Sequence, residues 1–282
     1  MEKSSALRHL VKSGIAIFIC CFFSNLVLAR SLDSTVSARK LIRSIRIDHP
    51  TKVSIDVYGN IYTADFQGNI FKFDSSGRML LRYSPSRKAE ISSLEARRNL
   101  NVFLFSKNLQ EYYFLDRFLA SASKGKFSQE IGFARAATIA SDNNIWLIDE
   151  VDFSLKKYDT HKQNYVLKTP LDLLLDPKAY QINYLIEYQN LLFVNDEASG
   201  LMVFDNLGNL RNKTGLKSLK YFNFLKDDLY YLKNDSLIFY NIYRSEIVKV
   251  ISLVDSHYTF ALCAKNRLYL FKEDQLDIYS LE

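Results

Sequence analysis

A repeat of about forty residues runs through most of this 282-residue chain and limits the folds open to it more than any other feature. The repeat is marked by an aromatic residue that recurs at intervals of 41, 43, 47, 37 and 39 residues, at Tyr62, Phe103, Trp146, Phe193, Tyr230 and Tyr269. A second marker, an apolar residue followed by Asp, Asn or Ser, follows each aromatic after 11 to 13 residues. The segments around these markers alternate apolar and polar residues with a period of two. That period predicts β-strands and argues against a helical repeat.

Each repeat contains enough residues for four short strands. The first complete unit, residues 53–83, divides into four alternating segments that end at Asn, Asp or Gly turns. Four strands in about forty residues are typical of a β-propeller blade. The last unit has only three strand-like segments, and an unassigned one, residues 40–47, precedes the first unit. The sequence therefore predicts an all-β, six-bladed β-propeller over residues 40–282, closed by an N-terminal strand. A two-domain β-sandwich would not keep the aromatic residues in phase.

The first unit resembles a known repeat family. Residues 56–65, Asp-Val-Tyr-Gly-Asn-Ile-Tyr-Thr-Ala-Asp, and the Gly68–Gly77 segment after them are similar to an NHL-type repeat. The likeness is weaker in the third and fourth units and degenerate in the others, whereas WD, kelch and sialidase signatures are absent. The resemblance implies a six-bladed ring. The Lys-, Asn- and Tyr-rich composition is typical of an exported bacterial protein, in style one of the Bacteroidota.

The N-terminus predicts export. Three basic residues lie within the first twelve, an apolar run covers residues 15–28, and Val27-Leu28-Ala29 suits a signal-peptidase site. We expect a cleavable Sec signal peptide over residues 1–29, then a short segment over 30–39, and the alternative is an uncleaved anchor. Cleavage would leave no membrane span. The protein is then expected in the periplasm or associated with the outer membrane.

Charge and cysteine content exclude several classes of protein. The net charge of +6 falls once residues 1–29 are removed, which leaves 34 basic and 30 acidic residues. The basic cluster at residues 39–46 suits a soluble edge strand. No nucleic-acid-binding motif is present, so no nucleic acid partner is expected. Cys263 is the single cysteine beyond the signal and lies in an apolar run, which predicts a buried, inert thiol and no internal disulfide.

Candidate catalytic groups are few. His49, His161 and His257 are the histidines beyond the predicted signal, and two or three imidazoles without further ligands make a poor metal site. No Gly-X-Ser-X-Gly elbow or calcium-loop motif occurs. We therefore expect no metal, no cofactor and no enzymatic activity. Two alternatives stay open. One is a lyase or hydrolase with a degenerate carboxylate site at the channel mouth, and the other is a carbohydrate or peptide receptor with exposed aromatics on one face.

One set of equivalent positions suggests a binding surface. The residues three positions after the repeated aromatics are Asp65, Ser106, Asp149, Asp196, Lys233 and Lys272. Glu150 and Glu197 add acid in two of these turns, so one ring face would be acidic on one side and basic on the other. Such a face can orient a partner, although Asp at this position can also cap its own turn. The sequence thus predicts a monomeric, non-catalytic scaffold of the cell envelope that holds a protein partner there.

Overall fold

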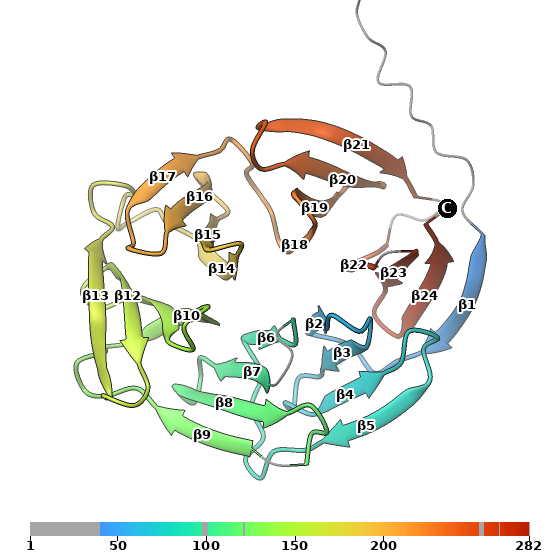
Figure 1. The fold of residues 1–282 in the computed structure, drawn as a ribbon, viewed down its shortest axis with the longest axis horizontal. Helices are drawn as coiled ribbons and strands as arrows, with labels where there is room; N and C mark the ends of the chain where they lie inside the picture. The colour runs from blue at the N-terminus through green and yellow to red at the C-terminus, as the bar shows by residue number, and fades with distance from the viewer. Residues whose placement is uncertain (1–39, 98–100, 121, 254–256, 265, 282) are drawn as a thin grey trace, which may run out of the picture. The chain divides into compact units, whose positions relative to one another are not determined.

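The chain folds into a ring of six β-sheets (Figure 1). The computed structural model describes residues 40–97, 101–120, 122–253, 257–264 and 266–281, all within the compact unit that spans residues 35–282. In these residues all regular structure is β, and every sheet has four strands. The prediction of an all-β, six-bladed propeller is confirmed. The predicted signal peptide and the 30–39 segment lie outside the described residues.

Each blade is a meander of antiparallel strands whose first strand lies nearest the ring axis and whose fourth lies at the outer rim (Figure 1). Blade 1 consists of β2 (Lys52–Ile55), β3 (Ile61–Ala64), β4 (Ile70–Phe73) and β5 (Met79–Tyr83). Blade 2 consists of β6 (Ser93–Glu95), β7 (Asn101–Ser106), β8 (Glu111–Asp116) and β9 (Ala122–Lys126). Blade 3 consists of β10 (Ala134–Ile139), β11 (Ile145–Asp149), β12 (Ser154–Asp159) and β13 (Asn164–Pro170). Blade 4 consists of β14 (Ile182–Tyr188), β15 (Leu191–Asp196), β16 (Gly200–Asp205) and β17 (Leu210–Lys213). Blade 5 consists of β18 (Phe222–Leu225), β19 (Asp228–Lys233), β20 (Ser236–Asn241) and β21 (Glu246–Ser252). Blade 6 consists of β22 (Phe260–Ala264), β23 (Arg267–Phe271), β24 (Gln275–Ser280) and β1 (Leu41–Arg46).

The ring closes between the two ends of the propeller sequence. Strand β1 pairs antiparallel with β24 and so completes the sheet β1-β24-β23-β22. Backbone bonds continue beyond both ends of this ladder, from Ile47 N to Asp274 O (3.0 Å) and from Ser280 N to Lys40 O (3.1 Å). The predicted closure by an N-terminal strand is confirmed.

The turns explain how a chain with only nine glycines makes so many hairpins. In blade 1 the sequence Asp-X-X-Gly recurs; at Gly68, for example, φ is +84° and an added Cβ would collide with the carbonyl of Ala89. Other blades place different residues at positive φ, among them Asn143 (65°) and Asn234 (51°). Asn tolerates this region better than most residues, so it replaces glycine there.

The core lies between the blades. Six clusters of buried apolar residues each combine side chains from two neighbouring blades, one cluster at every interface of the ring. All six repeated aromatics are no more than 1% exposed. Trp146 also donates from Nε1 to Glu187 of the next blade at 2.7 Å. Because a single blade leaves both its faces uncovered, burial of these aromatics requires the ring to close.

Side chains also connect blades that are not neighbours in the ring. Arg97 extends from the end of β6 in blade 2, and its guanidinium lies 4.8 Å from the ring centroid of Tyr188 and 5.8 Å from that of Phe224. Those two rings belong to blades 4 and 5 and stack on each other at 4.3 Å. Tyr221, just before β18 in blade 5, donates its hydroxyl to Val53 O in blade 1 at 3.2 Å. Two separate contacts therefore join blade 2 to blades 4 and 5, and blade 5 to blade 1.

Candidate functional site

The predicted site residues all lie on one face of the ring. The second strands of the six blades run in the same sense, so their C-terminal ends emerge on the same side. Each inter-blade connection also reaches a first strand from this side, because the first strand is antiparallel to the second. We call this side the connection face. It carries Asp65, Ser106, Asp149, Asp196, Lys233 and Lys272, each at or directly after the end of a second strand.

In blade 1 the acidic side chain at this position holds its own turn together. Asp65 is 3% exposed, and its Oδ1 accepts hydrogen bonds from the backbone N of Gln67 and Asn69, both at 2.9 Å. Its Oδ2 accepts from Nδ2 of Asn69 at 2.6 Å. In blade 2, the buried Ser106 donates to Glu90 O at 3.0 Å. Both side chains are thus used within the protein.

In blade 3 the equivalent acid forms a buried ion pair. Asp149 Oδ2 lies 2.7 Å from Lys156 Nζ, and the two side chains are 1% and 2% exposed. The carboxylate also accepts from the backbone N of Gly132 (2.9 Å) and Phe133 (3.1 Å), in the connection from blade 2. Burial opposes ionisation of Asp149, but the bond from Lys156 and the backbone bonds outweigh it and lower the pKa. The same pairing raises the pKa of Lys156 against the effect of its burial.

The remaining acids of the connection face also have partners. Asp196 is 1% exposed and accepts from the backbone N of Gln181 and Ser199. Glu150 is partly exposed and accepts from Arg135 Nη1 at 2.7 Å and from the hydroxyl of Tyr180 at 2.9 Å. Glu197 accepts from Nδ2 of Asn183. On the acidic side, little carboxylate charge is free for a partner.

The two lysines at the equivalent positions differ from the acids. Lys233 is exposed and ends β19 at a two-residue turn, where it pairs with Ser236 across the hairpin. Lys272 is partly buried, and its Nζ lies 5.1 Å from the ring centroid of Tyr258 and 3.9 Å from Asp277 Oδ2. The structure thus places all seven predicted residues on one face, with acids and lysines on different blades. A role for them in binding a partner stays a prediction.

Beside Lys233 the connection face opens into a hollow of about 610 Å³. Its residues come from the connection before blade 5, the second strand and turn of blade 5, the start of blade 6 and the first strand of blade 1. We call it the lysine hollow, because four lysines line it: Lys52, Lys217, Lys220 and Lys233. No Asp or Glu among the described residues lines it. The partly exposed aromatic residues among the rest of the lining are Tyr221, Tyr258 and Phe260.

Sequence reasoning found Lys233 but missed the other three lysines. Lys52 lies at the start of β2 in blade 1, and Lys217 and Lys220 lie in the connection between blades 4 and 5. These positions fall outside the phase of the repeated aromatics. Comparison of the inter-blade connections with one another would have shown the Lys-Ser-Leu-Lys segment at residues 217–220.

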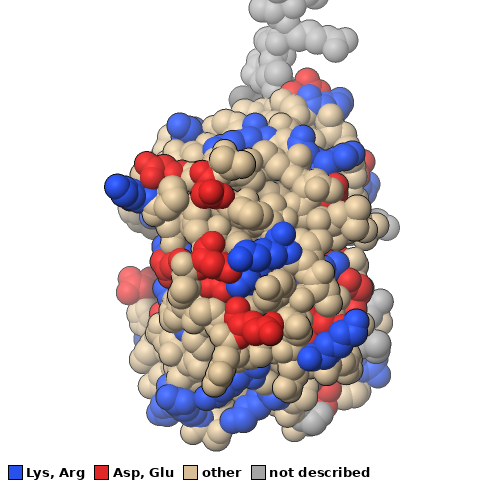
Figure 2. All heavy atoms as spheres, turned by 90° about the vertical axis from the view of Figure 1, so that its left-hand side faces the viewer, with Lys and Arg blue, Asp and Glu red and all other residues tan. Residues whose placement is uncertain are grey.

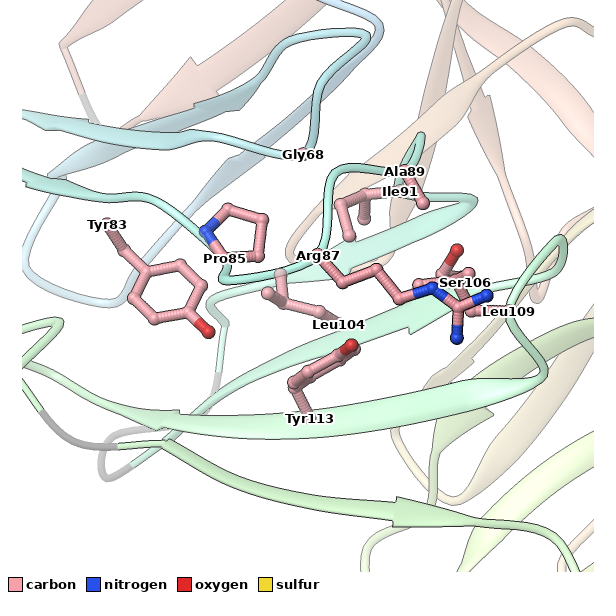
Figure 3. Close-up of a pocket in the computed structure, with 10 residues that line it drawn as sticks. All are labelled: Gly68, Tyr83, Pro85, Arg87, Ala89, Ile91, Leu104, Ser106, Leu109 and Tyr113. Atoms are coloured by element: carbon pink, nitrogen blue, oxygen red, sulfur yellow. The ribbon is translucent and has the colours of Figure 1, made fainter.

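Between blades 1 and 2 the same face has only a narrow slot (Figure 3). Arg87 and Pro85 lie over it, with Tyr113 on the other side. Its cavity volume is about 10 Å³, which suffices for about one water molecule. Glu111, behind the slot, lies 3.4 Å from Lys126 and 4.0 Å from Arg87. This part of the face is closed, and its two cations share one carboxylate.

Two other hollows have volumes similar to that of the lysine hollow but different linings. One, of about 660 Å³, lies along β1 and blade 1, and its arginines Arg43, Arg46 and Arg78 share the lining with Asp48 and Asp274. The other, of about 590 Å³, lies between blades 2 and 3 and contains one lysine, Lys124. Neither concentrates charge of one sign as the lysine hollow does.

Reactive groups do not converge in the part of the chain that the structure describes. No group of three or more His, Cys, Asp or Glu side chains is placed there to hold a metal ion. His49 Nδ1 lies 3.4 Å from Glu273 Oε1, with both side chains largely exposed. Cys263 is buried at 4% exposure in β22, as predicted. Two buried carboxylates near the axis, Glu95 and Glu187, bind Thr138 and Trp146 of blade 3 and so tie neighbouring blades together.

The receptor alternative predicts exposed aromatic residues on one face of the ring. The large exposed aromatics are instead distributed over several turns. Phe66 follows β3 on the connection face. Tyr58, Phe118 and Tyr243 lie on the opposite side, in turns of three different blades.

Comparison with solved structures supports the propeller fold. The WD40 domain of Pan2 from Neurospora crassa superposes with a TM-score of 0.63 at 6% identity, covering 88% of this chain and 98% of that one. A streptogramin B lyase has a TM-score of 0.58 at 13% identity, covering 85% and 87%. Virginiamycin B lyase from Staphylococcus aureus has a TM-score of 0.55 at 9% identity, covering 82% and 80%.

No protein-family model matches the chain, and no curated protein matches its sequence. At identities of 6 to 13% the structural likenesses show the propeller fold alone. The NHL-type assignment and the bacterial origin therefore stay predictions from the sequence.

None of the described residues belongs to a helix with the length and hydrophobicity needed to cross a membrane.

Proposed function

We propose that this propeller is a non-catalytic binding module that holds a protein partner on its connection face. The observation that carries the proposal is the lysine hollow, an open concave site of about 610 Å³ on that face. Ligand sites are commonly concave, with apolar walls and a few polar groups that set specificity. The hollow has this composition.

The arrangement favours binding over catalysis. A lyase or hydrolase with a carboxylate-based site needs acids that converge on a cavity. The acids at the equivalent positions, Asp65, Asp149 and Asp196, instead accept hydrogen bonds within the protein, and the hollow offers lysines and tyrosines. We further propose that the propeller is of the NHL type, and that it is exported by the N-terminal signal to the periplasm or the outer membrane of a bacterium, as a monomer.

Capture from the native source tests the function. The full protein would be immobilised in three forms: wild type, a hollow variant (Lys217→Ser, Lys220→Ser and Lys233→Ser) and a control variant (Lys88→Ser, Lys162→Ser and Lys178→Ser). The control removes the same charge from exposed lysines outside the hollow. We expect at least one protein to bind the wild type and the control variant but not the hollow variant, and to bind again when purified. If all three forms retain the same proteins, or none, the proposal is wrong.

A further inference from the structure

We propose that the lysine hollow recognises an acidic peptide segment, with its carboxylates held by the four lysines and its aliphatic parts against the tyrosine wall. This inference rests on the proposed function and names the chemistry of the partner.

The first argument is uncompensated charge. Within the described part of the chain, no Asp or Glu oxygen lies within 4.0 Å of the ammonium groups of Lys217, Lys220 and Lys233. Several other lysines of the ring form ion pairs. Lys156, for example, lies 2.7 Å from Asp149 and 2.8 Å from Asp152. Figure 2 shows the usual condition on another side of the molecule, where acidic and basic side chains are interspersed. Charge of one sign in a concave site attracts ligands of the opposite sign.

The second argument concerns Lys52, at the inner end of the hollow. Burial lowers its pKa; Glu90 partly offsets this shift, and Lys107 adds to it. Its ammonium donates to Thr51 O at 3.1 Å, a neutral acceptor. A carboxylate in the hollow would replace this neutral contact with an opposite charge beside the partly buried ammonium.

The third argument is the shape and chemistry of the lining, which suit a peptide better than a compact phosphate. Phosphate sites often use the paired donors of arginine or a cluster of backbone N–H groups. No arginine among the described residues lines the hollow, and two of its backbone N–H groups, on Ser218 and Thr259, already donate to Glu197 O and Phe271 O. The four lysines come from three separate segments, and single ammonium groups distributed in this way match several separate carboxylates.

The fourth argument concerns the aromatic residues that line the lysine hollow. Tyr258 lies between the hollow and Lys272, whose ammonium is 5.1 Å from the ring centroid. Tyr221 and Phe260 pack edge to face at 5.3 Å and continue the wall toward the axis. Aromatic and apolar surface of this kind can bury the methylene groups of glutamate side chains and apolar neighbours in a peptide.

The experiment measures binding of a fluorescein-labelled hexaglutamate peptide to the full protein by fluorescence anisotropy at low ionic strength. A hexaglutamine peptide of the same length is the matched probe without charge. We expect the hexaglutamate peptide to bind the wild type and the control variant, and to bind the hollow variant at least about ten-fold more weakly, because three ion pairs are lost. We expect the hexaglutamine peptide to show at least about ten-fold weaker binding to the wild type.

Three results would overturn the inference. One is equal binding of hexaglutamate to the hollow and control variants, and a second is equal binding of the two peptides to the wild type. The third is no peptide binding while inorganic tripolyphosphate binds the wild type and not the hollow variant, which would assign the hollow to phosphate compounds. If the peptide fails but capture from the native source still depends on the hollow lysines, this inference is wrong and the proposed function stands. If both fail, both are wrong.

Discussion

The acidic and the basic sides of the connection face use the same repeated position in opposite ways. In blades 1, 3 and 4 the residue there is an aspartate that is 1 to 3% exposed and accepts backbone hydrogen bonds. In blade 5 it is Lys233, which is exposed and lines a hollow. The difference follows from the turns.

The turn after Asp65 is longer and needs a side-chain acceptor for its backbone N–H groups. The blade 5 turn has two residues, with Asn234 at φ 51°, and closes without a cap. A short turn therefore frees the side chain at this position for contact with a ligand.

The largest effect should come from the buried ion pair on the acidic side. Asp149→Ala leaves the ammonium of Lys156 with Asp152 and the carbonyl of Glu130, and leaves the N–H groups of Gly132 and Phe133 without their acceptor. We expect the free energy of unfolding to fall by about 3 kcal/mol, measured by urea denaturation. A loss below about 0.5 kcal/mol would contradict a structural role for this acid.

A smaller loss is expected in blade 1. Asp65→Ala removes three hydrogen bonds to one turn but no ion pair. We expect a loss of about 1 to 2 kcal/mol in the same assay. The conservative variant Asp65→Asn keeps one acceptor and should lose less. Equal stability of Asp65→Ala and the wild type would show that this turn needs no cap.

Lowering the pH should destabilise the fold, because folding lowers the pKa of carboxylates on the acidic side of the connection face. Burial opposes ionisation of Asp152, but bonds from Lys156, Lys168 and Ser154 outweigh it and lower the pKa to about 2. Since the unfolded carboxyl has a pKa of about 3.9, its stabilising contribution is present above that value and is lost as the pH falls toward 2. We therefore expect the free energy of unfolding, measured by urea denaturation, to decrease less in Asp152→Asn than in the wild type as the pH is lowered from about 3.9 to about 2. Identical decreases would mean that the ion pairs of Asp152 do not contribute to folding.

The smallest change in the free energy of unfolding is expected on the basic side of the connection face. Lys217→Ser and Lys233→Ser remove exposed lysines that make no ion pair with any described residue. We expect each to change the free energy of unfolding by less than about 0.5 kcal/mol, again by urea denaturation. A loss as large as that of Asp65→Ala would mean that these lysines support the fold, and the contrast between the two sides would disappear.

Sequence and structure agree wherever a residue acts within one repeat or between successive repeats. The aromatics that mark the repeat recur in phase, and the structure buries all of them between blades, Trp146 among them. The missing strand of the last unit predicted that residues 40–47 close the ring, and β1 does so. The Asn, Asp and Gly residues that end the segments of the first unit also lie in turns, as Gly68 does at φ +84°. All of these depend on local spacing and period.

The site is different, because its parts are far apart in the chain. Lys52 and Lys217 are separated by most of the propeller sequence, yet they line one hollow. The same holds for Arg97 and Tyr221, which contact blades that are not their neighbours in the ring. No repeat period relates such residues, so their meeting could not be inferred from spacing.

The sequence by itself thus determined a closed ring of six blades, because the apolar faces of its repeats can be buried only against one another. Only the tertiary structure decided which charges are used inside the ring and which remain exposed, because that depends on the length of each turn and on which blades meet around a hollow. The aspartates are held by their own turns, whereas the lysines of blade 5 and its neighbours face an open hollow.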